Sequence, residues 1–377
     1  MKKSTLLTFA IIFTLAAVLV LGVLVASLSG KVDMLGFLKN GFASATSGEL
    51  IYDESFETTG IETIFVRTRE QKVEFFITDD DKITVRHFDY SDAEPVTANY
   101  YDDGTSLHFE CSQNIRLLSF SMVLPRLEIY VPRTFKAGVS VDVGSGSIVC
   151  KDDVNWGPTG LMTGSGSIRF EGDINCHNLG ASTGSGAIRI GGEITAELRV
   201  LLQTGSGSIH VDEDIKCVLL KAESGSGTIR LDDIYTGNGG NADITTRSGS
   251  IHLGELVSSG GSNLPGGTEF NITTGSGSIK AAAIKGFGVL NTRSGSIGID
   301  ALEVISDTEI SSGSGTVRVA LNRVQNLKIE ASTGSGSIRA GDYDFMFDAA
   351  GNGFCTIGSG ERGTLSIRTG SGSIVIN

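Results

Sequence analysis

The sequence predicts an all-β protein, a right-handed parallel β-helix of about 20 residues per coil, on three observations. A motif of the type Thr-Gly-Ser-Gly-Ser-Ile recurs eleven times between Gly144 and the C-terminus. Most neighbouring copies are 20 to 22 residues apart, with two longer insertions. Glycine accounts for 51 of the 377 residues, well above the usual share of about 7%, which indicates turns at regular intervals. A fixed period of this size is typical of a solenoid, in which each coil stacks on the next.

The motif reads as a corner followed by a short strand. In the copy at residues 204–209 the central glycine is Gly207, and the positions two and four residues later, Ile209 and Val211, are apolar in every copy. The position between them differs, so the segment alternates like a half-buried strand. Stacked copies form a parallel sheet, and parallel crossovers are nearly always right-handed. About eleven coils follow from the eleven copies.

The other residues of the motif fit a corner. Its central glycine either has a positive φ or leaves no room for a Cβ, and the sequence leaves both alternatives open. The Thr or Ser three residues earlier, such as Thr204, can hydrogen-bond along the stack or cover the turn. Eleven phased copies exclude a flexible linker. Neither a P-loop nor a dinucleotide fingerprint follows these glycines, so no cofactor is expected.

The N-terminus predicts a membrane anchor. Lys2 and Lys3 precede 23 uncharged residues, 6–28, which span about 34 Å as a helix and can cross a bilayer. A cleaved signal peptide, with residues 25–27 as the cleavage site, is the alternative. The two lysines place the N-terminus in the cytoplasm. We therefore expect a single-pass protein of the cell membrane whose C-terminal domain is extracytoplasmic.

The chain divides into four predicted segments. Residues 1–30 hold the cytoplasmic tail and membrane helix, and residues 31–46 a juxtamembrane linker. Residues 47–136 show short alternating strands with Asp- and Gly-rich turns, so they predict a small β-rich cap. The β-helix occupies residues 137–377. A cap is expected because a solenoid exposes apolar surface and unpaired backbone at its ends.

Charge and cysteine content narrow the partners. A net charge of −13 disfavours nucleic acid. The five cysteines show neither CxxC nor a zinc spacing, so no metal site is predicted. Cys176 and Cys217 share a column two coils apart, about 9.6 Å, which is too far for a disulfide. We expect the cysteines to be small buried apolar side chains.

One outward column is basic, and it is the predicted binding surface. It lies three residues after the central glycine and comprises Arg169, Arg189, His210, Arg230, His252, Lys280, Arg318 and Arg339. An acidic line that includes Asp173, Asp212 and Asp232 follows at the next turn. The two lines either compensate each other as a surface ladder, each pair contributing about 0 to 1 kcal/mol, or the basic column binds an anionic envelope polymer such as teichoic acid or an acidic polysaccharide. Calcium at the acidic turns is a third interpretation.

An enzyme is the alternative function, because β-helices also carry polysaccharide lyases and hydrolases. The acids recur with the repeat instead of breaking it, so we predict no catalytic residues and a structural or interaction role. A hydroxyl face for ice or glycan is a further alternative.

The membrane helix, the strand ending at Pro132 and the repeated Ser-Gly-[Ser/Thr/Ala]-[Ile/Val] strands together resemble a bacterial family of proposed adhesins, β-helical envelope domains of unknown function. The resemblance covers residues 127–377. It implies a surface or envelope-stress role and no catalytic residues. Family members often carry aspartate where this chain has Ser147, Ser167 or Ser208, so a ligand role of that carboxylate does not transfer.

The last copy of the motif, residues 370–374, stops at Asn377 with nothing after it to cover the final coil. Either the insertion between Gly336 and Gly372 folds back as a lid, or the bare edge pairs with another chain. The second alternative predicts self-association through the C-terminal coil.

Overall fold

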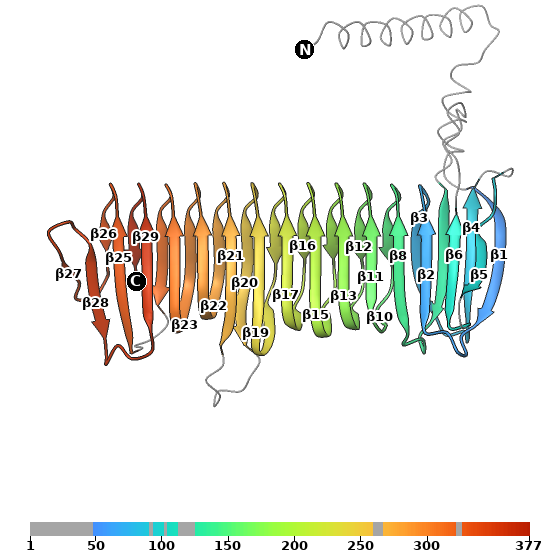
Figure 1. The fold of residues 1–377 in the computed structure, drawn as a ribbon, viewed down its shortest axis with the longest axis horizontal. Helices are drawn as coiled ribbons and strands as arrows, with labels where there is room; N and C mark the ends of the chain where they lie inside the picture. The colour runs from blue at the N-terminus through green and yellow to red at the C-terminus, as the bar shows by residue number, and fades with distance from the viewer. Residues whose placement is uncertain (1–47, 90–92, 102–103, 112–124, 259–266, 322–325) are drawn as a thin grey trace, which may run out of the picture.

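A computed structural model of the chain describes residues 48–89, 93–101, 104–111, 125–258, 267–321 and 326–377. Their regular structure is entirely β, with thirty strands in one continuous sheet. The strands form an elongated stack of coils (Figure 1), which confirms an all-β solenoid. The described residues contain no helix long and apolar enough to cross a membrane. The predicted membrane helix at residues 6–28 and the linker at 31–46 lie outside the described residues.

A coil of the repeat has three straight segments. In one coil these are β10 (Val154–Asn155), β11 (Thr159–Thr163) and β12 (Ile168–Phe170). In the following coils the first two segments merge into one long strand with an irregularity in its pairing. The long strands are β13 (Ile174–Thr183), β15 (Ile194–Thr204), β17 (Ile215–Ser224) and β19 (Ile234–Thr246), and the short ones are β14 (Ile188–Ile190), β16 (Ile209–Val211) and β18 (Ile229–Leu231).

Equivalent strands of successive coils pair in parallel, as the sequence predicts. Ile188 pairs with Ile209, and Ile209 pairs with Ile229, without a change of register. The stack continues through β20 (Ile251–Ser258), β21 (Thr268–Thr274), β22 (Ile279–Thr292), β23 (Ile297–Ser312) and β24 (Val317–Leu321). The handedness and the number of coils stay predictions.

The core is the inward apolar column repeated along the stack. Ile188, Ile209 and Ile229 are all 0% exposed. Burying one such side chain contributes about 1.5 to 3 kcal/mol. Because each isoleucine packs against its counterparts above and below, the apolar column is continuous from coil to coil.

The central glycine of the motif is required by close packing of the coils. A Cβ on Gly207 would lie 1.8 Å from the carbonyl oxygen of Gly186, and one on Gly227 would lie 1.9 Å from that of Gly207. None of the motif's central glycines is among the described glycines with positive φ. Of the two alternatives, lack of space for a Cβ is therefore the correct one.

The threonine of the motif joins neighbouring coils and also covers the turn. The hydroxyl of Thr204 donates to the carbonyl oxygen of Gly186 at 2.8 Å and accepts from the backbone N–H of Gly207 at 2.9 Å. The same pair of bonds recurs at Thr163, Thr183, Ser224, Thr246, Thr274, Thr292, Ser312, Thr333 and Thr369. Both predicted roles of this residue are thus confirmed.

The N-terminal strands extend the stack as well as covering its end. They are β1 (Glu49–Glu57), β2 (Thr63–Thr68), β3 (Lys72–Thr78), β4 (Lys82–Asp89), β5 (Thr97–Tyr101), β6 (Ser106–Cys111) and β7 (Arg126–Pro132), followed by β8 (Gly138–Val143) and β9 (Ile148–Cys150). Strand β2 pairs in parallel with both β6 and β8, and β3 with both β7 and β9.

Parallel pairing therefore crosses the boundary predicted between residues 136 and 137. Thr68 pairs with Val143 and Val73 with Ile148, so residues 68–73 form a copy of the corner in which Gln71 takes the glycine's place. Its side chain is buried and donates from Nε2 to Cys111 Sγ at 3.1 Å. The copy went unrecognised in the sequence because it contains no glycine. Antiparallel strands β4 on β7, β1 on β4 and β5 on β6 then cover the end.

The C-terminal copy of the motif does not end the stack, contrary to the expectation from chain order. The remaining strands are β25 (Leu327–Thr333), β26 (Ile338–Arg339), β27 (Met346–Phe347), β28 (Gly353–Ile357), β29 (Thr364–Thr369) and β30 (Ile374–Ile376). Strand β29 lies between β23 and β25 (Figure 1), and β30 lies between β24 and β26. The coil that contains Gly372 is therefore enclosed on both sides.

The insertion before it does fold back, but over a different coil. Strand β28 pairs antiparallel with β25, and β27 pairs antiparallel with β28. The insertion thus covers the coil of Gly336. Self-association through the C-terminal coil stays a prediction.

The cysteines are buried and form no disulfide, as expected. All five lie in described strands without a disulfide. Burial raises the pKa of the Cys176 and Cys217 thiols to about 12, so neither provides a thiolate at neutral pH.

Candidate functional site

The structure brings most of the predicted basic column into one line. Arg169, Arg189, His210, Arg230, His252 and Lys280 pair in that order on successive short strands. Gly298 follows Lys280, and Arg318 follows Gly298. Arg339 is separated from Arg318 by Val375, because the C-terminal coil lies between them. The column is therefore interrupted twice toward its C-terminal end.

The first part of the column is neutralised by neighbouring acids. Arg169 contacts Glu171 at 3.4 Å, and Arg189 contacts Asp212 at 3.1 Å. His210 Nε2 lies 2.8 Å from the other oxygen of Asp212. The predicted charge ladder is confirmed for the two arginines. Because the pairs are exposed, each contributes at most about 1 kcal/mol.

Part of the acidic line has a structural role. Asp153 Oδ1 accepts the backbone N–H of Asp173 at 2.9 Å, and Asp173 Oδ1 accepts that of Glu193 at 2.8 Å. Asp233 Oδ1 accepts the N–H of Glu255 at 2.7 Å. The described residues contain no group of three or more His, Cys, Asp or Glu placed to hold a metal ion. These aspartates instead hold the next coil in register.

The later part of the column surrounds a hollow of about 530 Å³. Arg230 on β18, His252 on β20, Lys280 on β22 and Arg318 on β24 line it. Gly298 on β23 lies among them, and a Cβ built there would meet only open space. The column therefore loses one side chain where the hollow forms.

Three cations, a histidine and two carboxylates line the hollow. Within the described part of the chain, Arg230, Lys280 and Arg318 form no ion pair, in contrast to Arg169 and Arg189. Asp232 and Asp300 also line the hollow, yet neither lies within ion-pair distance of these cations. Along the stack the three cations span about 19 Å, four steps of roughly 4.8 Å.

The pKa of His252 reflects the positive charges beside it. Its pKa is lowered from the ordinary value, first by burial and then by the positive charges of Lys280 and Arg230. The imidazole lies between two cations that repel its protonated form. An anion bound there would offset both charges, so the arrangement is suited to binding phosphate or carboxylate groups. We call Arg230, His252, Lys280 and Arg318 with Gly298 the basic groove.

The sequence also left two arginines unassigned. Arg247 and Arg293 replace the glycine two residues before the central glycine, and both are exposed at a second hollow. Their departure from the repeat was visible in the sequence and was the signal that could have identified them.

Comparison with known proteins identifies a family. The sequence profile of the Toastrack DUF4097 family matches this chain twice, over residues 61–254 and 193–377. A solved structure of a proposed cell adhesion protein from Clostridium sporogenes is similar at 10% identity, with 86% of this chain and 98% of that chain covered and a TM-score of 0.22. A proposed adhesin from Bacteroides fragilis is similar at 11% identity, with 71% and 99% covered and a TM-score of 0.27. No curated protein matches the chain significantly.

Proposed function

Because the chain belongs to the Toastrack DUF4097 family, we propose that it is an adhesin-like interaction protein of the cell envelope. Its solenoid lies outside the membrane and binds an anionic envelope polymer rich in phosphate, such as teichoic acid. The uncharged residues 6–28 anchor it in the membrane. No catalytic role is part of this proposal.

The observation that carries the proposal is the set of unpaired cations in the basic groove. Guanidinium groups bind phosphate oxygens through two parallel hydrogen bonds, and an ammonium group adds a point charge. Arg230 and Arg318 lie about 19 Å apart along the stack, with Lys280 between them. A polymer with regularly spaced phosphates can contact all three at once, which multiplies weak single contacts.

Co-sedimentation of the full-length chain with purified wall teichoic acid tests the groove. The variant R230A/K280A/R318A is expected to lose sedimentation with the polymer. The matched control R169A/R189A removes two arginines of the same column whose charges are already paired, and it is expected to retain binding. Equal loss in both variants would mean that only overall charge matters, and full binding by the triple variant would rule out the groove.

The anchor is tested separately by cell fractionation. The full-length chain is expected in the membrane fraction, accessible to protease added outside the cell. Deletion of residues 6–28 should remove it from that fraction. Protection of the solenoid from external protease would contradict an extracytoplasmic location.

A further inference from the structure

Two arginines occupy a corner position where the repeat otherwise has glycine. A Cβ on Gly225 would lie 2.1 Å from the carbonyl oxygen of Gly205, so a side chain at this corner requires the neighbouring coil to shift. Arg247 and Arg293 are nevertheless placed there, one coil on either side of Gly275. Neither residue contributes to the apolar core, since both are exposed.

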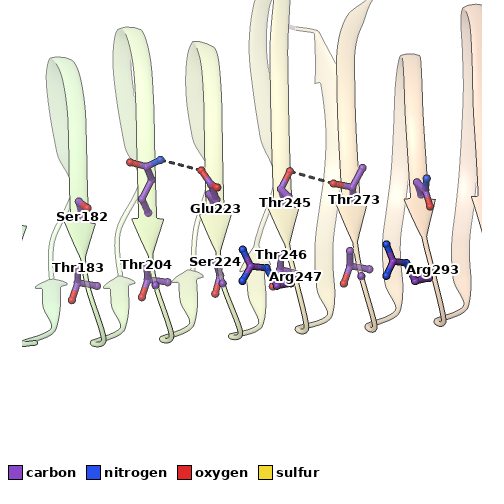
Figure 2. A pocket seen from close by; sticks show the side chains of 16 residues that line it. Ser182, Thr183, Thr204, Glu223, Ser224, Thr245, Thr246, Arg247, Thr273 and Arg293 are labelled. Carbon is purple, nitrogen blue, oxygen red and sulfur yellow. Dashed lines mark hydrogen bonds between the residues drawn. The ribbon is translucent and has the colours of Figure 1, made fainter.

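The guanidinium groups of Arg247 and Arg293 are both available to bind a ligand. In the parts of the chain that the structure describes, neither arginine has an ion-pair partner. Other exposed arginines, such as Arg67 and Arg368, do form ion pairs. They lie two coils apart, about 9.6 Å at roughly 4.8 Å per coil. Figure 2 shows both side chains at the corner, next to the outward side chains of the long strands.

The surface beside them is a row of hydrogen-bonding groups. A hollow of about 690 Å³ runs along it. Gln203 Nε2 donates to Glu223 at 3.1 Å, and Thr273 donates to Thr245 at 3.3 Å (Figure 2). Hydrogen bonds from Gln203 and Lys221 lower the pKa of Glu223, so it is an ionised acceptor. The row presents one polar side chain per coil.

Toward the N-terminal end the same face becomes more apolar and carries an aromatic pair. Arg67 also lines it and pairs there with Glu110 at 3.8 Å and with Asp142 at 3.7 Å. A second hollow of about 650 Å³ adjoins the first, because Ser182 and Gln203 line both. Gly160 and Gly180 leave its floor open, and Met162 on its wall is 57% exposed.

An aromatic pair closes this apolar end. The ring of Phe65 stacks on that of His108, with 4.5 Å between their centroids, and both residues line the second hollow. The trough, as we call the two hollows together, thus has an aromatic end and a cationic end.

We propose that the trough binds an extended acidic polysaccharide lying along the stack. Arg247 and Arg293 bind carboxylates on every second sugar, while the polar row binds hydroxyl groups. The apolar face of a sugar ring packs on Phe65. One sugar unit of an extended chain is close in length to one coil, so the repeat of the protein matches that of the polymer. A polymer of phosphates without rings would use the arginines but leave the aromatic end empty.

The trough is independent of the basic groove. It lies on the strand segments before the motif corner, whereas the groove lies on the segments directly after the corner. The two lining sets share no residue. Substitutions in the trough should therefore leave binding at the basic groove unchanged, and the reverse also holds.

The test measures binding of the full-length chain to polygalacturonate, to its carboxyl-reduced neutral form and to polyphosphate. The variant R247G/R293G restores the glycine of the repeat, so its thermal stability should equal or exceed that of the parent. We expect each arginine to contribute about tenfold in affinity for polygalacturonate. The parent should bind the neutral polymer only as weakly as the variant binds polygalacturonate.

The control is Arg169→Ala. Arg169 lies after the motif corner and lines neither hollow of the trough, and it pairs with Glu171 at 3.4 Å, so its loss should leave binding unchanged. A second variant, Phe65→Ala, should weaken binding of polygalacturonate without changing binding of polyphosphate. Equal weakening by Arg169→Ala, equal affinity for the neutral polymer, or tighter binding of polyphosphate than of polygalacturonate would each overturn the proposal.

Discussion

The hydroxyl of Thr369 donates a hydrogen bond of 2.8 Å to the carbonyl oxygen of Gly315, 54 positions earlier in the chain. Elsewhere the same bond joins adjacent coils, as from Thr183 to Gly166 across 17 positions. Thr333 then donates to Gly372 at 2.8 Å. The C-terminal coil is therefore bonded, by the ordinary contacts of the repeat, between two coils that are neighbours in sequence.

Removal of residues 364–377 should release the coil at residues 327–339. That coil would lose β29 and β30, its parallel partners. Amide hydrogen exchange measured by mass spectrometry should show lost protection at residues 327–339 and retained protection from β13 to β19, because a solenoid coil depends on its nearest neighbours. Full protection at residues 327–339 would mean that β25 stacks directly on β23.

Thr204→Ala should destabilise the solenoid by about 1 to 3 kcal/mol. The change leaves the carbonyl of Gly186 and the N–H of Gly207 without their partner, and unsatisfied buried groups are costly. Thr204→Ser is the control, since Ser224 makes both bonds naturally. Urea unfolding checks the difference, and equal stability of the two variants would contradict the role of the hydroxyl.

Gly207→Ala should be more severe, at about 2 to 4 kcal/mol. Its Cβ would lie 1.8 Å from the carbonyl oxygen of Gly186 in the preceding coil, a backbone clash that rotation of a side chain cannot relieve. Gly160→Ala is the matched control, because a Cβ there meets nothing within 4 Å. Thermal unfolding of both variants provides the measurement, and similar melting temperatures would exclude close packing as the cause.

His252 should make polymer binding depend on pH. Lys280 and Arg230 help to lower its pKa, so binding of an anion should raise that pKa, and affinity should increase as the pH falls through it. Without ligand, the contribution of neutral His252 to stability is fully present above its unfolded pKa of about 6.5 and is lost as the pH falls through the folded pKa.

An NMR titration of the imidazole, with and without teichoic acid, measures both pKa values. Lys280→Ala should raise the pKa of His252 in the free protein by removing a repelling charge. A pKa that the polymer does not change would place the anion away from His252.

The repeated part of the fold could be predicted from the sequence because each coil repeats the same local contacts. Ile209, Gly207 and Thr204 have the same surroundings as their counterparts, so eleven copies give eleven observations of one environment. The ends have no such redundancy. Gln71 fills a glycine position beside β6, where its side chain donates to Cys111, and the position of Gly372 depends on which of two equivalent coils it joins.

The sequence likewise predicted only part of the candidate site. The column of cations followed from the period, and its register is as expected from Arg169 to Lys280. The sequence did not show which of those cations form ion pairs. Asp212 contacts both Arg189 and His210, and this depends on the direction in which its side chain points. Gly298 shows the same limit, since a missing side chain in the sequence becomes a hollow only in three dimensions.

The enclosed C-terminal coil also bears on the order in which the molecule is made. The coil at residues 327–339 leaves the ribosome before its inner neighbour exists, and its parallel partners are made only with residues 364–376. Translation that stops before residue 364 would thus yield a protein with most of its stack formed and the coil at residues 327–339 unpaired.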